Sequence, residues 1–419
     1  MRSKRILALV TGVAAIAIGI YAETIGSGNK NRPSNDQVSI AVDKGLKWLV
    51  SVQGKDGGWG QDGGETSYVR QGERLESNGN DVANTAVAAE ALLHTGNTPT
   101  RGEYRQSFER AIRFILEHVE RTPAEGLAVT DLTGTQIQRK LGPYIDTFLT
   151  SKLLAELDGT MGDVKANARV RADLQKCVAK IEKNQLKDGS WNIAGGWAPI
   201  LGTSMASQSL YMAREKGAAR PSEALDKVAQ YTMVTAAAPA AAAPPAAAAP
   251  KAVPVSGRAA TGVVGGVPGG VAGGVMAGSM ASTVSVDGAA GVPLYKRAQE
   301  LEQLSRTDAD RKVNAVKIRE ITGQLSDQKF VTGFGSYGGE EFFSYLNISD
   351  SLHRTGGQEW QKWNGDMKAK LLKLQNEDGT WAGHHCITGR VAVTSAAILL
   401  LTADREPAPI ETSMNIKKR

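Results

Sequence analysis

Three copies of one short pattern constrain the fold of this chain more than any other feature. Each copy reads Gln, two residues, Asp, Gly, one small residue and Trp, and each closes a stretch with apolar residues at helical spacing. The positions that argue for a shared structure are Gln53, Gly57 and Trp59, then Gln185, Gly189 and Trp191, and last Gln375, Gly379 and Trp381. Identical spacing at three distant places indicates a repeated structural unit.

A low-complexity segment interrupts the repeat once. The first and second glutamines lie 132 positions apart, and the second and third lie 190 apart. Residues 236–292 are rich in Ala, Pro, Gly and Val and contain no aromatic residue, so they cannot build a core. Without these 57 residues the second interval becomes 133, close to the first. The sequence therefore predicts one array, from 39–235 and 293–404, with a disordered insert.

Helical periodicity recurs between the motifs. Charged amphipathic stretches alternate with stretches rich in Ala, Ser, Thr and Leu, as in 106–121 followed by 144–157. The helix at 222–234 is expected to continue after the insert into a charged helix from about Leu294 to Ile321, followed by a partner at 342–354. No alternating strand pattern is present. The sequence thus predicts an all-α fold of about five to six stacked helical hairpins, with charged helices outside and small-residue helices inside.

The residues of the motif suit a structural role. A glutamine amide at the end of a helix can donate to terminal carbonyls and to a neighbouring helix. The glycine four residues later tolerates a positive φ, which lets the chain reverse. The tryptophan then covers the turn, and its indole N–H needs one acceptor. We interpret the three motifs as architecture, in preference to direct ligand contacts.

The motif, its three copies and the helical hairpins resemble the prenyltransferase and squalene oxidase repeat of the terpenoid cyclase and protein prenyltransferase superfamily. The resemblance covers most of residues 39–404, apart from the insert. It implies an α/α toroid whose inner helices line a central apolar cavity for an isoprenoid chain. Activity does not follow from the fold.

The catalytic signatures of that superfamily are missing here. The acid motif of the squalene–hopene type of cyclase is rich in aspartate, and this chain has no two adjacent aspartates. The prenyltransferase branch holds zinc with Asp, Cys and His in an Asp-x-Cys arrangement, but Gln175 stands two residues before Cys177. The thioester motif of the complement-like toroids, a Cys followed closely by Glu-Gln, is absent too. These departures favour a non-catalytic protein, and no cofactor is expected.

Several polar residues remain as candidates for a site. Glu340 and Glu341 stand at the expected start of an inner helix with Asp350 about two turns on, so they could form an acid–base group in a cavity. Carboxylates at such places also stabilise helix N-termini, and Asp81 and Asp146 occupy similar positions. The remaining candidates for metal ligands are adjacent: His384, His385 and Cys386. Three neighbours in sequence cannot all reach one tetrahedral ion comfortably, and a polar loop is the alternative.

The N-terminal residues have the order of an export signal. Arg2, Lys4 and Arg5 precede an uncharged run from Ile6 to Ala22. We expect residues 1–23 to be a cleaved signal peptide or a membrane anchor, and 24–38 to be a polar linker. In both cases the positive end stays in the cytoplasm. The body is then exported, either anchored to the inner membrane and facing outward, or released as a periplasmic or secreted protein.

Charge bears on the partners of this chain. The formal net charge is +6, and three of these charges lie in the first five residues and three in the last three. The body is therefore formally neutral, which argues against nucleic-acid binding; residues 405–419 form a basic tail. We expect a non-catalytic envelope protein that binds an apolar, isoprenoid-like ligand or a protein partner. A divergent terpenoid cyclase or isoprenoid-processing enzyme, and a scaffold whose ring is filled by side chains, are the alternatives.

Overall fold

Helices make up the regular secondary structure of the part of the chain that the structure describes. The computed structural model describes residues 33–62, 79–193, 199–220, 222–237, 292–332, 337–384 and 387–405. Within these ranges there is one isolated β-bridge and no strand, which confirms the all-α fold. The helices are α1 (Asn35–Ser51), α2 (Val82–His94), α3 (Arg105–Arg121), α4 (Gln136–Leu141), α5 (Ile145–Leu157), α6 (Val164–Lys183), α7 (Pro199–Glu215), α8 (Glu223–Ala237), α9 (Val292–Leu304), α10 (Asp308–Val313), α11 (Ala315–Gln324), α12 (Gln328–Val331), α13 (Gly339–Thr355), α14 (Gly357–Leu374) and α15 (Arg390–Leu401).

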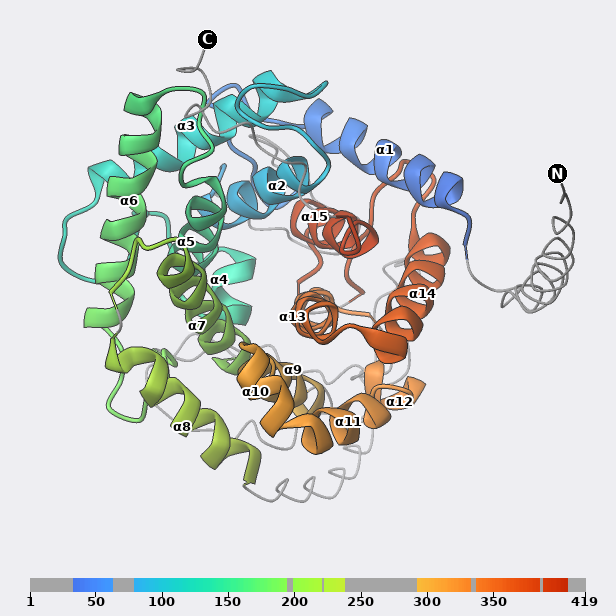
Figure 1. Ribbon diagram of the computed structural model, residues 1–419. Helices are drawn as coiled ribbons and strands as arrows, with labels where there is room; N and C mark the ends of the chain where they lie inside the picture. Colours follow the sequence, from blue (N-terminus) through green and yellow to red (C-terminus); the bar gives the residue numbers. More distant parts are fainter. Residues whose placement is uncertain are drawn as a thin grey trace, which may run out of the picture.

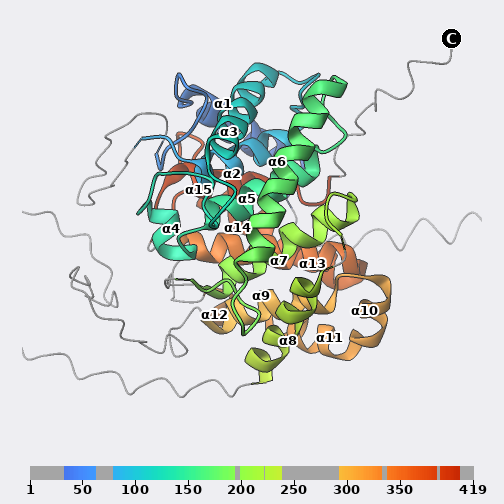
Figure 2. The same ribbon diagram turned by 90° about the vertical axis from the view of Figure 1, so that its left-hand side faces the viewer.

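The described helices lie in two concentric layers (Figure 1). In the inner layer α2, α5, α7, α9, α13 and α15 each pack against the next, and α15 packs against α2. We call these six helices the inner ring. Around it lie α1, α3, α6, α8, α11 and α14, each in contact with at least one inner helix. In the view from the side the outer helices α6 and α8 face the viewer (Figure 2).

Side-chain size and charge account for the two layers. The inner helix α2 is rich in alanine, and every residue from Val82 to Leu93 is buried. Small side chains let such a helix approach neighbours on several sides. The outer helix α3 instead buries one face, which includes Phe108 and Ile115, and carries arginine and glutamate elsewhere.

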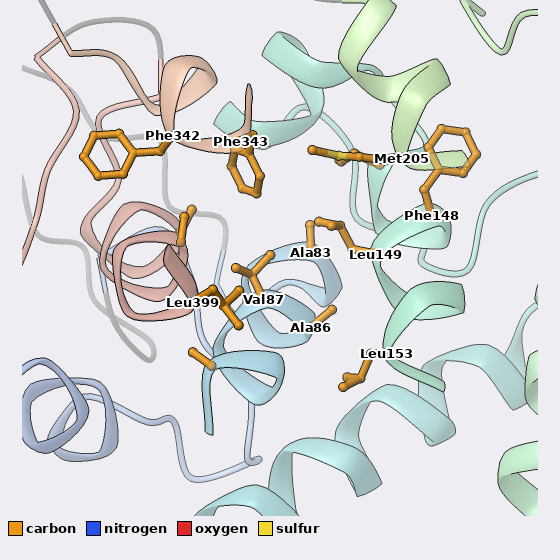
Figure 3. Close-up of a cluster of buried hydrophobic side chains, with 14 of the residues drawn as sticks. Ala83, Ala86, Val87, Phe148, Leu149, Leu153, Met205, Phe342, Phe343 and Leu399 are labelled. Carbon is orange, nitrogen blue, oxygen red and sulfur yellow. The ribbon is translucent and has the colours of Figure 1, made fainter. Parts of the chain in front are cut away.

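Apolar side chains fill the middle of the inner ring. Figure 3 shows Val87, Leu149, Met205, Phe343 and Leu399, from five different inner helices, extending toward a common space. All five are buried in the same hydrophobic cluster. Burial of this kind stabilises a fold by about 1.5–3 kcal/mol for each large side chain. Packing among these apolar side chains therefore stabilises the inner ring around its centre.

The prediction of one charged helix from about Leu294 to Ile321 is wrong in two respects. The segment forms three helices, because Thr307 and Asp310 build a capping box that starts α10 immediately after α9. The first of the three, α9, lies in the inner ring although it is charged. Its Glu300 and Glu302 are buried and pair with Arg297 and Arg306, which lets a charged helix occupy an inner position.

Two further expectations concern the ends of segments. Helix α1 begins at Asn35, inside the expected polar linker, because Ser34 and Gln37 form a capping box. The expected signal or anchor at residues 1–23, residues 238–291 of the expected insert and residues 406–419 of the tail lie outside the described residues. Among the helices that the structure describes, none combines the length and the apolar character that crossing a membrane requires.

The three glutamine motifs join neighbouring outer helices in the same way. Each glutamine Nε2 donates to the carbonyl of the motif's own glycine at 2.8–3.0 Å. The same nitrogen donates to a carbonyl of another outer helix: Ser107 of α3, Ala224 of α8 and Ala41 of α1, at 2.9, 2.8 and 2.8 Å respectively. The third bond joins Gln375, which follows α14, to α1, the first of the outer helices.

The tryptophan and glycine of each motif complete the link. The buried indoles of Trp59, Trp191 and Trp381 donate to a carbonyl ten residues earlier, at 2.7–2.8 Å. The three glycines have φ near +90°. A Cβ at Gly189 would meet the Lys227 carbonyl oxygen at 2.3 Å, so the glycine lets the turn pack on the backbone of α8.

Candidate functional site

A pocket of about 280 Å³ lies where the C-terminal halves of the inner helices meet. All six helices of the inner ring, or the turns that follow them, contribute to its lining, for example through Glu90, Lys152, Gln208, Arg306, Asp350 and Leu399. Most of the lining residues are charged or polar. We call this pocket the end pocket. The resemblance noted above implies an apolar cavity, and the end pocket differs from it in chemistry.

Lys152 lies between two carboxylates in the end pocket. Its Nζ donates to Glu90 Oε1 at 2.6 Å and lies 3.9 Å from Asp350 Oδ2. Burial lowers the pKa of Lys152, but Glu90 and Asp350 outweigh burial and leave this pKa raised. The lysine is therefore a cation that links α2, α5 and α13.

His94 and Glu156 form a second ion pair beside the first. His94 Nε2 lies 2.9 Å from Glu156 Oε2. Burial alone would lower the pKa of His94, but the neighbouring Glu156 carboxylate outweighs burial and raises this pKa to about 9. Burial alone would raise the pKa of Glu156, but the positive charge of His94 outweighs burial and leaves this pKa lowered. The imidazole is thus protonated at neutral pH.

The opposite wall of the end pocket comes from α7, α9 and α13. Arg306 pairs with Glu302 at 3.0 Å, and Gln208 Nε2 donates to Asp350 Oδ2 at 2.9 Å. Arg354 donates to Ser351 Oγ through one Nη at 3.3 Å, while its buried Nε has no partner among the described residues.

Glu340 and Glu341 lie at the other end of the inner ring, where their carboxylates accept hydrogen bonds from backbone amides. Glu340 Oε2 accepts from the amide of Ile387 at 3.2 Å. Glu341 accepts from Tyr295 Oη at 3.1 Å and from the amide of Gly338 at 2.9 Å. Burial raises the pKa of Glu341 to about 7. Both carboxylates begin α13, a position that the dipole of the helix favours.

Asp350 is separated from these two glutamates. It follows Glu341 by nine positions in one continuous helix, which places it about 14 Å further along the axis. The three carboxylates therefore do not form the acid–base group considered from the sequence. Asp350 belongs to the end pocket, whereas Glu340 and Glu341 stabilise the start of α13.

Of the three metal candidates after Trp381, His385 and Cys386 lie outside the described residues. His384 is exposed, its amide donates to the Tyr337 carbonyl at 2.7 Å, and its side chain lines a second pocket of about 510 Å³ with Asp378 and Arg390. Cys177 is a buried free thiol in α6, and burial raises its pKa to about 12.

Asp81 and Asp146 form a buried pair at the start of the inner helices α2 and α5. Asp81 Oδ1 caps α2 by accepting from the Asn84 amide at 2.7 Å, and Asp146 Oδ1 accepts from the amide of Ala83 at 3.0 Å. Burial, and then the charge of Asp146, raise the pKa of Asp81 to about 7. Burial raises the pKa of Asp146 to about 6. Both residues support the ring and lie outside the end pocket.

The raised pKa of Asp81 predicts that stability falls as pH rises. The folded chain keeps this carboxyl protonated up to about pH 7, while the unfolded chain loses the proton near the ordinary value of 3.8. This contribution is complete below pH 3.8 and is lost as pH rises to about 7, which amounts to about 2–4 kcal/mol. Urea unfolding at pH 5 and pH 8 should show a smaller fall for Asp81→Asn than for the unsubstituted chain.

Asparagine suits this test because it also caps helices well. The buried amide oxygen of Asn84 has no hydrogen-bond partner among the described residues, so a flipped Asn84 can accept from the new amide. The control is Asp163→Asn at the exposed cap of α6, which should leave the pH dependence of the unsubstituted chain in place. An equal fall in Asp81→Asn and in the unsubstituted chain would contradict the prediction.

Comparison with known proteins adds no functional assignment to this geometry. The sequence matches no protein-family model and no curated protein.

The sequence interpretation missed most of the end pocket. It singled out Asp350 but not Glu90, His94, Lys152 or Glu156. One signal was available: Glu90 and His94 lie four residues apart in an otherwise alanine-rich inner helix, and Lys152 and Glu156 repeat this spacing in the next one. Charged residues at the same turn of two small-residue helices indicate a shared polar site.

Proposed function

We propose that this chain is an exported α/α toroid of the prenyltransferase and squalene oxidase repeat type that works as a binding protein for a small, charged, water-soluble ligand. The convergence of six inner helices on the charged end pocket is the observation that carries this proposal. The closed order of helix contacts and the three equivalent glutamine links support the toroid.

The lining of the end pocket favours a charged ligand over an isoprenoid. An apolar chain placed there would remove water from the partly exposed side chains of His94 and Asp350 without replacing its hydrogen bonds, which is costly. A ligand with amine, carboxylate or phosphate groups can exchange hydrogen bonds with them. The C-terminal ends of the inner helices add a partial negative charge, which favours a positive group on the ligand.

The positions of the carboxylates support binding without catalysis of cyclisation. A cyclase needs an acid that faces an apolar cavity, but Glu340 and Glu341 accept hydrogen bonds from backbone and from Tyr295. The charged run before Ile6 supports export, as argued from the sequence. A ligand met outside the cytoplasm would then be a solute of that compartment.

Extraction of the purified full-length chain tests the proposal. We expect mass spectrometry of the denatured protein to find a charged compound near one per chain in the aqueous extract, and no stoichiometric isoprenoid in the organic extract. In Asp350→Asn the occupancy should fall at least about 10-fold, because a charge-assisted hydrogen bond is lost. The side chain of Asp350 is partly exposed, so the fold should tolerate this change.

Asp131→Asn provides the control, since Asp131 is exposed and lies outside the end pocket. It should retain the ligand at the occupancy of the unsubstituted chain. A stoichiometric isoprenoid would contradict the proposal and restore the apolar cavity. A folded protein with two empty extracts would also contradict it and favour a scaffold for protein partners.

A further inference from the structure

Three potential metal ligands converge at one side of the end pocket. Glu90 and His94 lie one turn apart on α2, and Glu156 faces them from α5. One carboxylate oxygen of each glutamate and one imidazole nitrogen all lie within 4.8 Å of one another. The set comes from two adjacent rigid helices, so the backbone positions these ligands before any ion arrives.

The spacing of these atoms fits a first-row divalent ion after small side-chain shifts. Nitrogen and carboxylate ligands lie about 2.0–2.2 Å from zinc, which places tetrahedral ligand atoms about 3.4 Å apart. His94 Nε2 and Glu156 Oε2, now 2.9 Å apart, need to separate slightly, and Glu90 needs to approach. Two carboxylates and one imidazole suit Zn²⁺ and neighbouring ions that accept nitrogen and oxygen ligands.

Lys152 is the cation that such an ion would have to displace. Its Nζ now pairs with Glu90 at 2.6 Å, but Asp350 Oδ2 lies only 3.9 Å from the same nitrogen. The ammonium can therefore leave Glu90 and pair with Asp350 without losing a carboxylate partner. His94 releases its proton when it binds the ion. The ion then neutralises Glu90 and Glu156, while Lys152 and Asp350 form a second neutral pair.

We propose that Glu90, His94 and Glu156 bind a divalent transition-metal ion, and that Lys152 turns to Asp350 when the ion binds. Three protein ligands leave a coordination position open toward the end pocket. A carboxylate, phosphate or amine of the ligand can occupy that position. The inference rests on the proposed function because the metal ion would lie at one side of the end pocket and would contact the ligand proposed for that pocket.

Cobalt spectroscopy of the chelator-treated full-length chain tests the ligand set directly. We expect Co²⁺ to bind once per chain and to give the visible absorption of a four- or five-coordinate site. The near-ultraviolet charge-transfer band of a Co²⁺–thiolate bond should be absent, which separates this site from one that includes Cys386. Zn²⁺ should compete for the same site in equilibrium dialysis.

Substitutions separate the ligands from the bulk charge of the pocket. Glu156→Gln and His94→Gln should weaken Co²⁺ binding at least about 10-fold, as loss of a ligand requires. His118→Gln on the outer helix α3 and Cys386→Ser should bind like the unsubstituted chain. Far-ultraviolet circular dichroism of each variant establishes that the helices are intact.

Lys152→Met gives a result that misfolding cannot imitate. Removal of the competing ammonium leaves Glu90 for the ion alone, so Co²⁺ binding should tighten at least about 10-fold. Unchanged or weaker binding in Lys152→Met overturns the proposal, as does unchanged binding in Glu156→Gln. A chain that retains a charged compound but binds no Co²⁺ overturns the metal site and leaves the proposed function standing. Co²⁺ binding at this site with both extracts empty overturns the ligand alone.

Discussion

Replacement of Trp381 by alanine is expected to lower the free energy of unfolding by about 3–5 kcal/mol. The indole is fully buried, its N–H donates to the Leu371 carbonyl at 2.8 Å, and its ring lies against Gly45 of the first outer helix. The substitution removes this packing and leaves a cavity and an unpaired carbonyl at the contact between α14 and α1. Urea unfolding followed by circular dichroism measures the loss.

Trp48→Ala is the matched control for this prediction. Trp48 is half-buried on the same first helix, where Arg390 lies over its ring at 5.0 Å. Part of the Trp48 side chain stays in contact with water, so its loss should cost less than that of Trp381, about 1 kcal/mol. Equal losses in the two variants would show that the motif tryptophan contributes no more than a partly exposed one.

Gly189→Ala is expected to destabilise the chain by about 2–4 kcal/mol. Two effects add at this residue. The positive φ of +90° strains any side chain by about 1 kcal/mol, and the new Cβ would lie 2.3 Å from the Lys227 carbonyl oxygen. Since that oxygen belongs to the backbone of α8, relief requires the turn and the helix to move apart, at about 1–3 kcal/mol.

Gly217→Ala separates the clash from the backbone strain. Gly217 also has a positive φ, +66°, but nothing lies within 4 Å of its Cβ position. This variant should lose only the strain, about 1 kcal/mol. If Gly189→Ala and Gly217→Ala have the same midpoint in urea, the contact between the motif and α8 is not needed for stability.

The repeated motif predicted the helical architecture because its chemistry is local. The glutamine, the glycine and the tryptophan each satisfy groups within about ten residues, so their roles follow from spacing and side-chain type. The contacts of Gln53 with Ser107 and of Gln375 with Ala41 extend to other helices, and the identity of those helices could not be read from the sequence.

The end pocket was harder to predict because it depends on the rotation of six helices. A charged residue in an inner helix can face the pocket, a neighbouring helix or an ion-pair partner, and hydrophobic periodicity does not distinguish these places. Helix α9 shows the difficulty. Its charges suggested an outer position, whereas paired arginines allow its glutamates to be buried in the inner ring.

The contact between α14 and α1 also bears on the order in which the chain can fold. Gln375 and Ala41 are 334 residues apart, so the exposed side of the first helix stays unpaired until the last hairpin has been synthesised. In an open array the terminal units always keep one bare side, but here that side is covered only at the end. A contact between residues so far apart in sequence forms slowly. Until α14 packs against α1, the incomplete chain exposes the apolar side of α1 to solvent.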